Sequence, residues 1–205
     1  MIENKQSIII DYFNIEGTPG GNQDWCMDFW MYLGGCAALA ACDLSICLSK
    51  NLGLADCCPY DPEHMTRKQY VDFSMVMKPY IHPRMGGVAK LSLFTDGYGK
   101  YLNDRGYDVT FDVCPGEKSF EEAEIFVKNA LKKNLPVPFL LLRHRDKSFK
   151  DLNWHWFMIT GYDVKNERSI LKYHTYGEEQ EADFQRLSAT GMYRRGGMAA
   201  IKEIR

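Results

Sequence analysis

The sequence predicts an α+β protein in which helices from the first part of the chain pack on one side of an antiparallel sheet formed by the last third. Segments with helical spacing and capping residues dominate up to about residue 135, and short β-branched or aromatic runs separated by turns follow. Helices followed by a run of strands are typical of this class. We therefore expect one domain over 1–205, with a helical lobe over about 1–105 and a sheet lobe over about 106–205.

Helices are indicated by alanine- and leucine-rich runs and by capping boxes, in which a serine or threonine is followed three residues later by glutamine or glutamate. Capping boxes open at Thr66 and Ser119, and Gly53 is placed to end the alanine-rich run. The predicted helices cover residues 36–51, 66–77, 92–105 and 119–134, with a short one at 184–189.

Strands are indicated by runs rich in β-branched and aromatic residues that are bounded by turn-forming residues. The predicted strands cover residues 7–13, 107–113, 137–142, 154–162, 169–173 and 198–204, and the predicted turns between the last of them cover 147–153, 165–168 and 177–180. A site would then lie between the helical and the sheet parts of the chain.

Composition excludes several classes of protein. Hydrophobic residues make up 45% and charged residues 25%, which indicates a folded globular chain. The net charge of −2, with scattered basic residues, predicts neither nucleic acid nor a membrane as partner. Seven irregularly spaced cysteines favour a reducing compartment. The polar start Met1–Gln6 and the short apolar run after it form no secretion signal, so we expect a cytoplasmic protein unless a leader has been trimmed.

Cys36 is the candidate nucleophile. It stands where the helix predicted over 36–51 begins, and the unpaired N–H groups and aligned dipoles of a helix N-terminus favour a thiolate. Gly34 and Gly35 directly before it permit close approach of a substrate chain, so we assign them to substrate binding. Cys26 is the rival candidate, but no clean helix begins there.

His155 is the histidine best placed to accept the proton of a thiol and return it to a leaving group. It opens the apolar run over 156–162, so a strand would fix it at one end of the sheet. Trp154 and Trp156 flank it and would shield it from water, and we assign Trp156 to substrate binding. Three other histidines lie in proline-bearing loops or in a basic tract, where solvated surface is expected: His64, His82 and His144.

Aromatic residues precede the nucleophile. They could line a substrate cleft, but such a run is more often core, and we expect core positions for at least half of them. They are Trp25, Phe29, Trp30 and Tyr32.

Four ordered segments carry a pattern that points to one family. They are Asn-Gln-Asp-Trp at 22–25, Gly-Gly-Cys-Ala-Ala-Leu-Ala-Ala at 34–41, His-Trp-Phe-Met-Ile-Thr-Gly-Tyr-Asp at 155–163 and Thr-Tyr-Gly at 175–177. This pattern resembles the papain-like cysteine peptidases, most closely their bacteriocin-leader-peptidase-like branch. Those families show a glutamine upstream of a Gly-Cys helix start, a histidine opening an apolar strand, and a polar residue before an aromatic-Gly pair. The resemblance implies a papain-like fold and a bacterial thiol peptidase.

The resemblance also implies two supporting roles. Gln23 would donate to an oxyanion hole beside the Cys36 backbone amide. A third residue would orient the imidazole. In the family an asparagine or aspartate usually stands three residues before the glycine of the aromatic-Gly pair, and here His174 takes that position. The alternatives for this role are Thr175, Asn153 and Asp163.

Three functional hypotheses follow for this site. The first is a cysteine hydrolase that cuts a peptide or other acyl substrate through a thioester on Cys36. The second keeps the site but makes it an acyltransferase or amidase, and the third is an inactive papain-like binding protein in which His174 marks a lost triad. The oligomeric state stays open.

A metal site is a fourth hypothesis. Cys57, Cys58 and His64 lie within eight residues of one another. Adjacent cysteines are poorly spaced for one tetrahedral zinc ion, and no second pair completes the set. We therefore expect no metal and no other cofactor.

Overall fold

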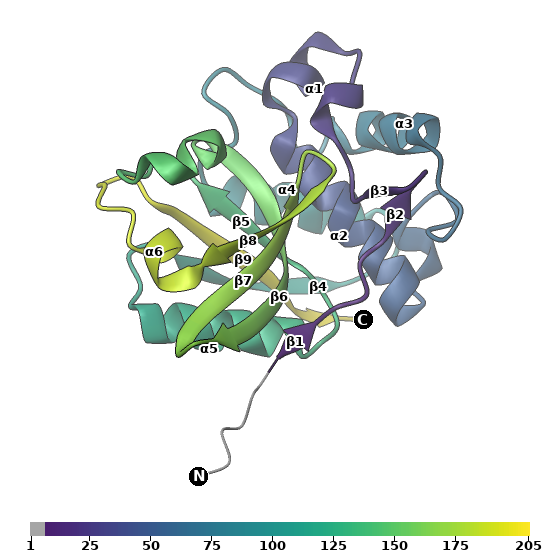
Figure 1. Ribbon diagram of the computed structural model, residues 1–205. Helices are drawn as coiled ribbons and strands as arrows, with labels where there is room; N and C mark the ends of the chain where they lie inside the picture. The colour runs from purple at the N-terminus through teal and green to yellow at the C-terminus, as the bar shows by residue number, and fades with distance from the viewer. Residues whose placement is uncertain (1–6) are drawn as a thin grey trace.

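The computed structural model describes residues 7–205 and shows helices packed around a seven-stranded antiparallel sheet (Figure 1). The strand order is β4-β9-β5-β6-β7-β8, and β1 pairs with β6 outside that path. The mixed α+β class predicted from the sequence is therefore observed. The polar start Met1–Gln6 lies outside the described residues.

The helices form where capping and composition predict them. Both capping boxes are present: Thr66 caps α3 and Ser119 caps α5. Gly53 ends α2 in the left-handed conformation, with φ of 70°. The α-helices are α1 (Phe29–Gly34), α2 (Cys36–Leu52), α3 (Arg67–Met77), α4 (Leu91–Asn103), α5 (Phe120–Leu131) and α6 (Phe184–Ser188), with 3-10 turns η1 (Gln23–Trp25), η2 (Ala55–Cys57) and η3 (Lys147–Leu152). None of the helices described over 7–205 has the length and apolar character needed to cross a membrane.

The strands of the sheet are β1 (Ile8–Ile9), β4 (Val109–Pro115), β5 (Val137–Leu141), β6 (His155–Lys165), β7 (Arg168–Thr175), β8 (Glu178–Asp183) and β9 (Gly196–Ile204), and β2 (Asn14–Ile15) pairs with β3 (Thr18–Pro19) in a separate ribbon. The strand predicted over 7–13 is shortened to β1. β8 forms where the sequence predicts part of a turn. Its Glu-Glu-Gln-Glu run has no apolar alternation, so the sequence does not indicate a strand there. Its edge position exposes these charges to solvent.

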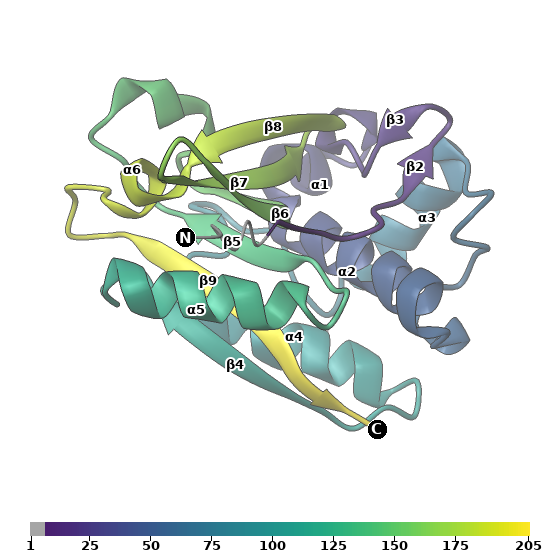
Figure 2. The same ribbon diagram turned by 60° about the horizontal axis from the view of Figure 1, so that its bottom comes forward.

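Helices cover both faces of the sheet, so the prediction of a one-sided layer is wrong. On one face, Leu140 and Leu142 pack in a core with residues of α2, α3 and α4. On the other, Phe139 and Leu141 pack with residues of α5 and α6. Figure 2 shows α5 in front of β9 and α4 behind it. β5 is therefore buried on both sides, which explains its continuous apolar sequence.

The N-terminal segment also contributes to the sheet. Ile8 and Ile9, from the part of the chain assigned to the helical lobe, pair with Tyr162 and Gly161 of β6, and the Ile10 N–H donates to the Thr160 carbonyl at 3.0 Å. These bonds bring the loop that follows β1 to the face of the sheet where α2 lies. That loop carries Gln23, and α2 begins at Cys36.

Candidate active site

Cys36 begins α2 directly after a one-residue link from α1. The link is Gly35, whose N–H donates to the Met31 carbonyl at 2.9 Å and whose carbonyl accepts from Leu39. A Cβ atom on Gly35 would lie 2.4 Å from the Met31 carbonyl oxygen, so a side chain does not fit there. A Cβ atom on Gly34 would lie 3.4 Å from the Arg84 carbonyl oxygen, an ordinary contact. The second glycine is therefore required by the tight turn into the nucleophile helix.

His155 begins β6, as expected, and its ring is held from two sides. Its Nε2 lies 2.6 Å from Thr175 Oγ1, at the end of β7. The Tyr176 ring stacks on the imidazole, with centroids 4.6 Å apart and planes 6° from parallel, and its hydroxyl lies 3.4 Å from Nδ1. In the tautomer that carries its proton on Nε2, that N–H donates to Thr175 and Nδ1 is free to accept a proton.

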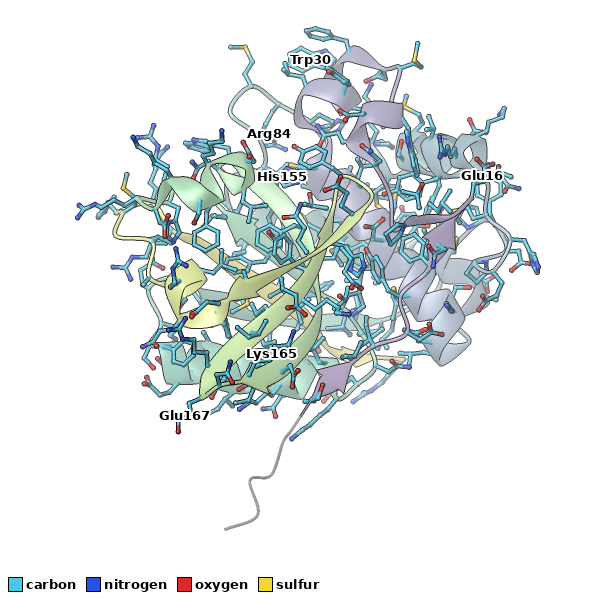
Figure 3. All side chains as sticks on the ribbon, viewed as in Figure 1. Glu16, Trp30, Arg84, His155, Lys165 and Glu167 are labelled. Atoms are coloured by element: carbon cyan, nitrogen blue, oxygen red, sulfur yellow. The ribbon has the colours of Figure 1, made fainter. Side chains whose placement is uncertain are left out.

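Figure 3 shows where this end of the sheet lies: His155 is at the upper end, with Arg84 and Trp30 above it, and Lys165 and Glu167 mark the opposite end of the β6–β7 hairpin.

Cys36 and His155 line one cavity of about 30 Å³, large enough for roughly one or two water molecules. The backbone N–H of Trp156, the residue after His155, favours the thiolate form of Cys36 and so acts to lower its pKa. Gln23, His174, Thr175 and Tyr176 are among the other residues that line the same space. The nucleophile and base predicted from the sequence are therefore brought to one cavity.

Burial dominates the electrostatics of the pair. It raises the pKa of the Cys36 thiol, and the backbone hydrogen bonds from Trp156, Ala37 and Cys36 itself lower that pKa by less. Burial also lowers the pKa of His155 to about 4. The sequence predicts a lowered thiol pKa from the helix N-terminus alone. In the folded chain a neutral thiol faces a neutral imidazole at pH 7, because both charged forms lose their hydration.

Gln23 reaches the cavity because its loop is tied back to the β7–β8 turn. The Asn22 side chain donates to the Tyr176 carbonyl at 2.8 Å, and the Gly177 N–H donates to the Gly21 carbonyl at 3.0 Å. Gln23 Nε2 donates to the Tyr32 carbonyl at 2.7 Å, which leaves one of its two N–H bonds for another acceptor. Its Oε1 is buried and accepts no hydrogen bond from any residue between 7 and 205.

His174 lines the cavity but does not contact His155 by any hydrogen bond among the described residues. Its Nδ1 lies 3.0 Å from Thr160 Oγ1, and its ring stacks on Tyr12 at 4.3 Å. Burial lowers its pKa to about 4, although Glu179 lies 3.5 Å from its Nε2. The orienting contact expected of His174 is made by Thr175.

The other two candidates for the orienting role are engaged elsewhere. Asn153 Oδ1 accepts from the His144 backbone at 2.8 Å. Asp163 Oδ1 accepts from the Val164 backbone at 2.8 Å, toward the far end of β6.

Trp156 is placed differently from the prediction. Its side chain is only 3% exposed, donates to the Val88 carbonyl at 2.8 Å and stacks on Phe94 with centroids 4.6 Å apart. The indole is therefore core, and only the backbone N–H of Trp156 faces the site. For the aromatic run before the nucleophile, the expectation that at least half of the residues are core is wrong. Three of the four are exposed: Phe29, Trp30 and Tyr32.

Asp43 is a site residue that the sequence analysis missed. It lies on α2 two turns after Cys36 and lines the same cavity. Its carboxyl group accepts from the hydroxyls of Tyr12 and Tyr70, each at 2.7 Å. Burial raises its pKa to about 6. The buried carboxyl group thus ties the loop before Gln23 to the nucleophile helix.

The alternative cysteine sites are not assembled. Cys26 is buried with its sulfur 3.8 Å from Ser74 Oγ. Cys57 and Cys58 are buried, whereas His64 is exposed and bonds Asp61 at 2.9 Å. Over residues 7–205, no three His, Cys, Asp or Glu side chains converge as they would around a metal ion.

No protein-family model matches the sequence, and no curated protein matches it.

Proposed function

We propose that the protein is a papain-like cysteine hydrolase that uses Cys36 as nucleophile and His155 as general acid and base. The observation that carries this proposal is the cavity shared by the two side chains, with His155 Nε2 held by Thr175 so that Nδ1 remains for proton transfer. A nucleophile and a base that share one cavity, with the base oriented by a third group, are the parts used in covalent acyl chemistry.

The chemistry follows from these positions. His155 Nδ1 takes the thiol proton as the Cys36 sulfur bonds to the acyl carbon of the substrate. The carbonyl oxygen becomes an oxyanion, which the Cys36 backbone N–H and the free N–H of Gln23 can stabilise. The imidazolium returns the proton to the departing amine and leaves a thioester. Water, deprotonated by His155, then releases the acid and the thiol.

Transfer of the acyl group to an amine is the second candidate. Cys36 is 7% exposed and the Tyr176 ring covers His155, so water reaches the thioester only through a narrow space. Exclusion of water protects a thioester from hydrolysis. Once an acyl substrate is found, adding a primary amine separates the candidates, because an acyltransferase forms the amide in preference to the free acid.

The experiment that tests the proposal measures the alkylation rate of each cysteine by iodoacetamide between pH 5 and pH 9, read by peptide mass spectrometry. Cys36 is expected to react at a nearly constant rate across this range, since His155 is neutral above its pKa of about 4 and is available as base. His155→Ala is expected to slow the reaction about 100-fold. His64→Ala, which removes an exposed histidine, is the matched control and leaves the rate unchanged.

The six other cysteines serve as internal standards, because all of them are free and buried. A Cys36 rate equal to theirs, and equal in His155→Ala, would contradict the proposal. A non-catalytic binding protein would then be the better account of the fold.

A further inference from the structure

A cavity of about 440 Å³ lies beside the candidate active site. It is bounded by the start of α4, the end of β5 and the start of β9. Its lining residues come from segments far apart in the sequence and are Ala89, Lys90, Leu91, Glu117, Leu140, Leu142, Tyr193, Arg194, Arg195 and Gly196. A cavity of this volume falls in the range of small-ligand sites.

The cavity combines apolar walls with an excess of positive charge. Leu140 and Leu142 are buried side chains that provide apolar wall, and three cationic residues line the same space against the single carboxylate of Glu117. The three cations are Lys90, Arg194 and Arg195. Within the described residues, none of them forms an ion pair with an acidic side chain at 4.0 Å or less.

The two arginines are not equally available. Arg195 donates to the carbonyls of Met192 and Gly116, at 3.1 and 3.3 Å. No described side chain or carbonyl accepts a hydrogen bond from Arg194, which is exposed and lies over an aromatic ring at cation–π distance. The N–H groups of Arg194 are therefore free to bind a ligand anion.

The aromatic ring is that of Trp154, which lines neither cavity but stands next to His155 in the sequence. Arg194 and Arg143 lie over this ring, with their guanidinium carbons 5.7 and 5.8 Å from its centroid. Trp154 is the residue before His155, and its N–H donates to the carbonyl of Leu142, which lines the cavity. Arg194 thus lies over the side chain of the residue that directly precedes the candidate base.

We infer that this cavity binds a carboxylate-bearing segment of the acyl substrate, an inference that rests on the proposed function. A planar guanidinium with free N–H groups can bind a carboxylate in a bidentate pair, and the Trp154 ring 5.7 Å away limits the positions that the Arg194 guanidinium can adopt. The apolar walls suit the methylene groups of an acidic side chain such as that of glutamate. Glu117 limits the net charge of the lining to about +2, which fits one carboxylate better than a polyanion.

The experiment compares two peptides on the full chain carrying Cys36→Ala, which prevents turnover. The peptides are acetyl-Ala-Ala-Glu-Ala-amide and its glutamine counterpart, so that a single carboxylate distinguishes them. By titration calorimetry the glutamate peptide is expected to bind about 10- to 100-fold more tightly, as for a charge-assisted hydrogen bond in place of a neutral one. Added salt is expected to reduce that preference.

Matched variants identify the residues that cause the preference for the glutamate peptide. Arg194→Gln is expected to abolish it, and Lys90→Gln to reduce it. Arg145→Gln, which removes an exposed arginine that does not line the cavity, is expected to retain it. Equal affinity for the two peptides, or an equal loss in Arg145→Gln and Arg194→Gln, would overturn the inference. Stronger competition by inorganic phosphate than by acetate would assign the cavity to a phosphate group and also overturn it.

The outcomes are separable from those of the proposed function. A reactive Cys36 in the wild-type chain with no preference between the peptides overturns the carboxylate subsite alone. A clear preference with an unreactive Cys36 overturns the hydrolase and leaves an anion-binding cavity.

Discussion

The carboxyl group of Asp43 makes the stability of this protein depend on pH in a direction that can be worked out from its surroundings. It is fully buried, and burial raises its pKa from 3.8 to about 6 despite the hydrogen bonds from Tyr12 and Tyr70. Between about pH 4 and pH 6 the folded chain therefore binds this proton more tightly than the unfolded chain does. The contribution of Asp43 to stability falls as pH rises through that window, by about 3 kcal/mol in total.

Asp43→Asn is the perturbation that isolates this contribution. Its amide is neutral at every pH and can still pair with both tyrosine hydroxyls. The free energy of unfolding of the wild type, minus that of the variant, is expected to become more negative by about 2.4 kcal/mol between pH 4 and pH 7, because the unfolded carboxyl is already partly ionised at pH 4. The buried histidines His155 and His174 are present in both proteins, so their titration cancels in the difference.

The assay is urea unfolding at pH 4, 5, 6 and 7 under reducing conditions, followed by tryptophan fluorescence and analysed by linear extrapolation. Asp96→Asn on the exposed side of α4 is the control for removing a surface carboxylate. Parallel profiles for the wild type and Asp43→Asn would refute the reasoning. A difference of opposite sign would show that the two hydroxyls favour the carboxylate by more than burial disfavours it.

Three further expectations concern the site. Thr175→Val removes the hydroxyl at His155 Nε2 and should slow Cys36 alkylation about 10- to 100-fold, whereas Thr175→Ser should retain the rate. Tyr176→Ala uncovers the imidazole, so the pKa of His155 should rise from about 4 toward its ordinary value in an NMR titration. An unchanged pKa would exclude shielding by that ring. Gly35→Ala should lower stability by about 1–3 kcal/mol in thermal unfolding, and an equal loss in the control Gly34→Ala would contradict the steric argument.

The parts of the fold that were predicted well depend on short-range signals. Capping boxes at Thr66 and Ser119 place α3 and α5 because the interacting groups lie three residues apart. The glycine pair before Cys36 and the apolar run after His155 place both residues at the ends of elements. Each of these features can be recognised without knowing what packs against it.

The choice between His174 and Thr175 as the partner of His155 depends on strand register. The β6–β7 pairing shifts between Ile159 and Gly161, which changes the side-chain alternation that a regular ladder would impose. Counting three residues back from Gly177 therefore finds the correct end of β7. It does not show whether the side chain of His174 or that of Thr175 reaches the imidazole of His155.

The helix start at Cys36, the strand start at His155 and the mixed α+β class could be predicted from the sequence, because they follow from propensity and from contacts within a few residues. The other features of the site depend on packing between distant parts of the chain. Helices on both faces of the sheet bury the site, so desolvation rather than the helix N-terminus sets the direction of the Cys36 pKa. The cavity that joins Lys90 to Arg194 brings together residues about a hundred positions apart. Burial and such long-range contacts depend on how the whole chain packs, so they cannot be predicted from a local sequence pattern.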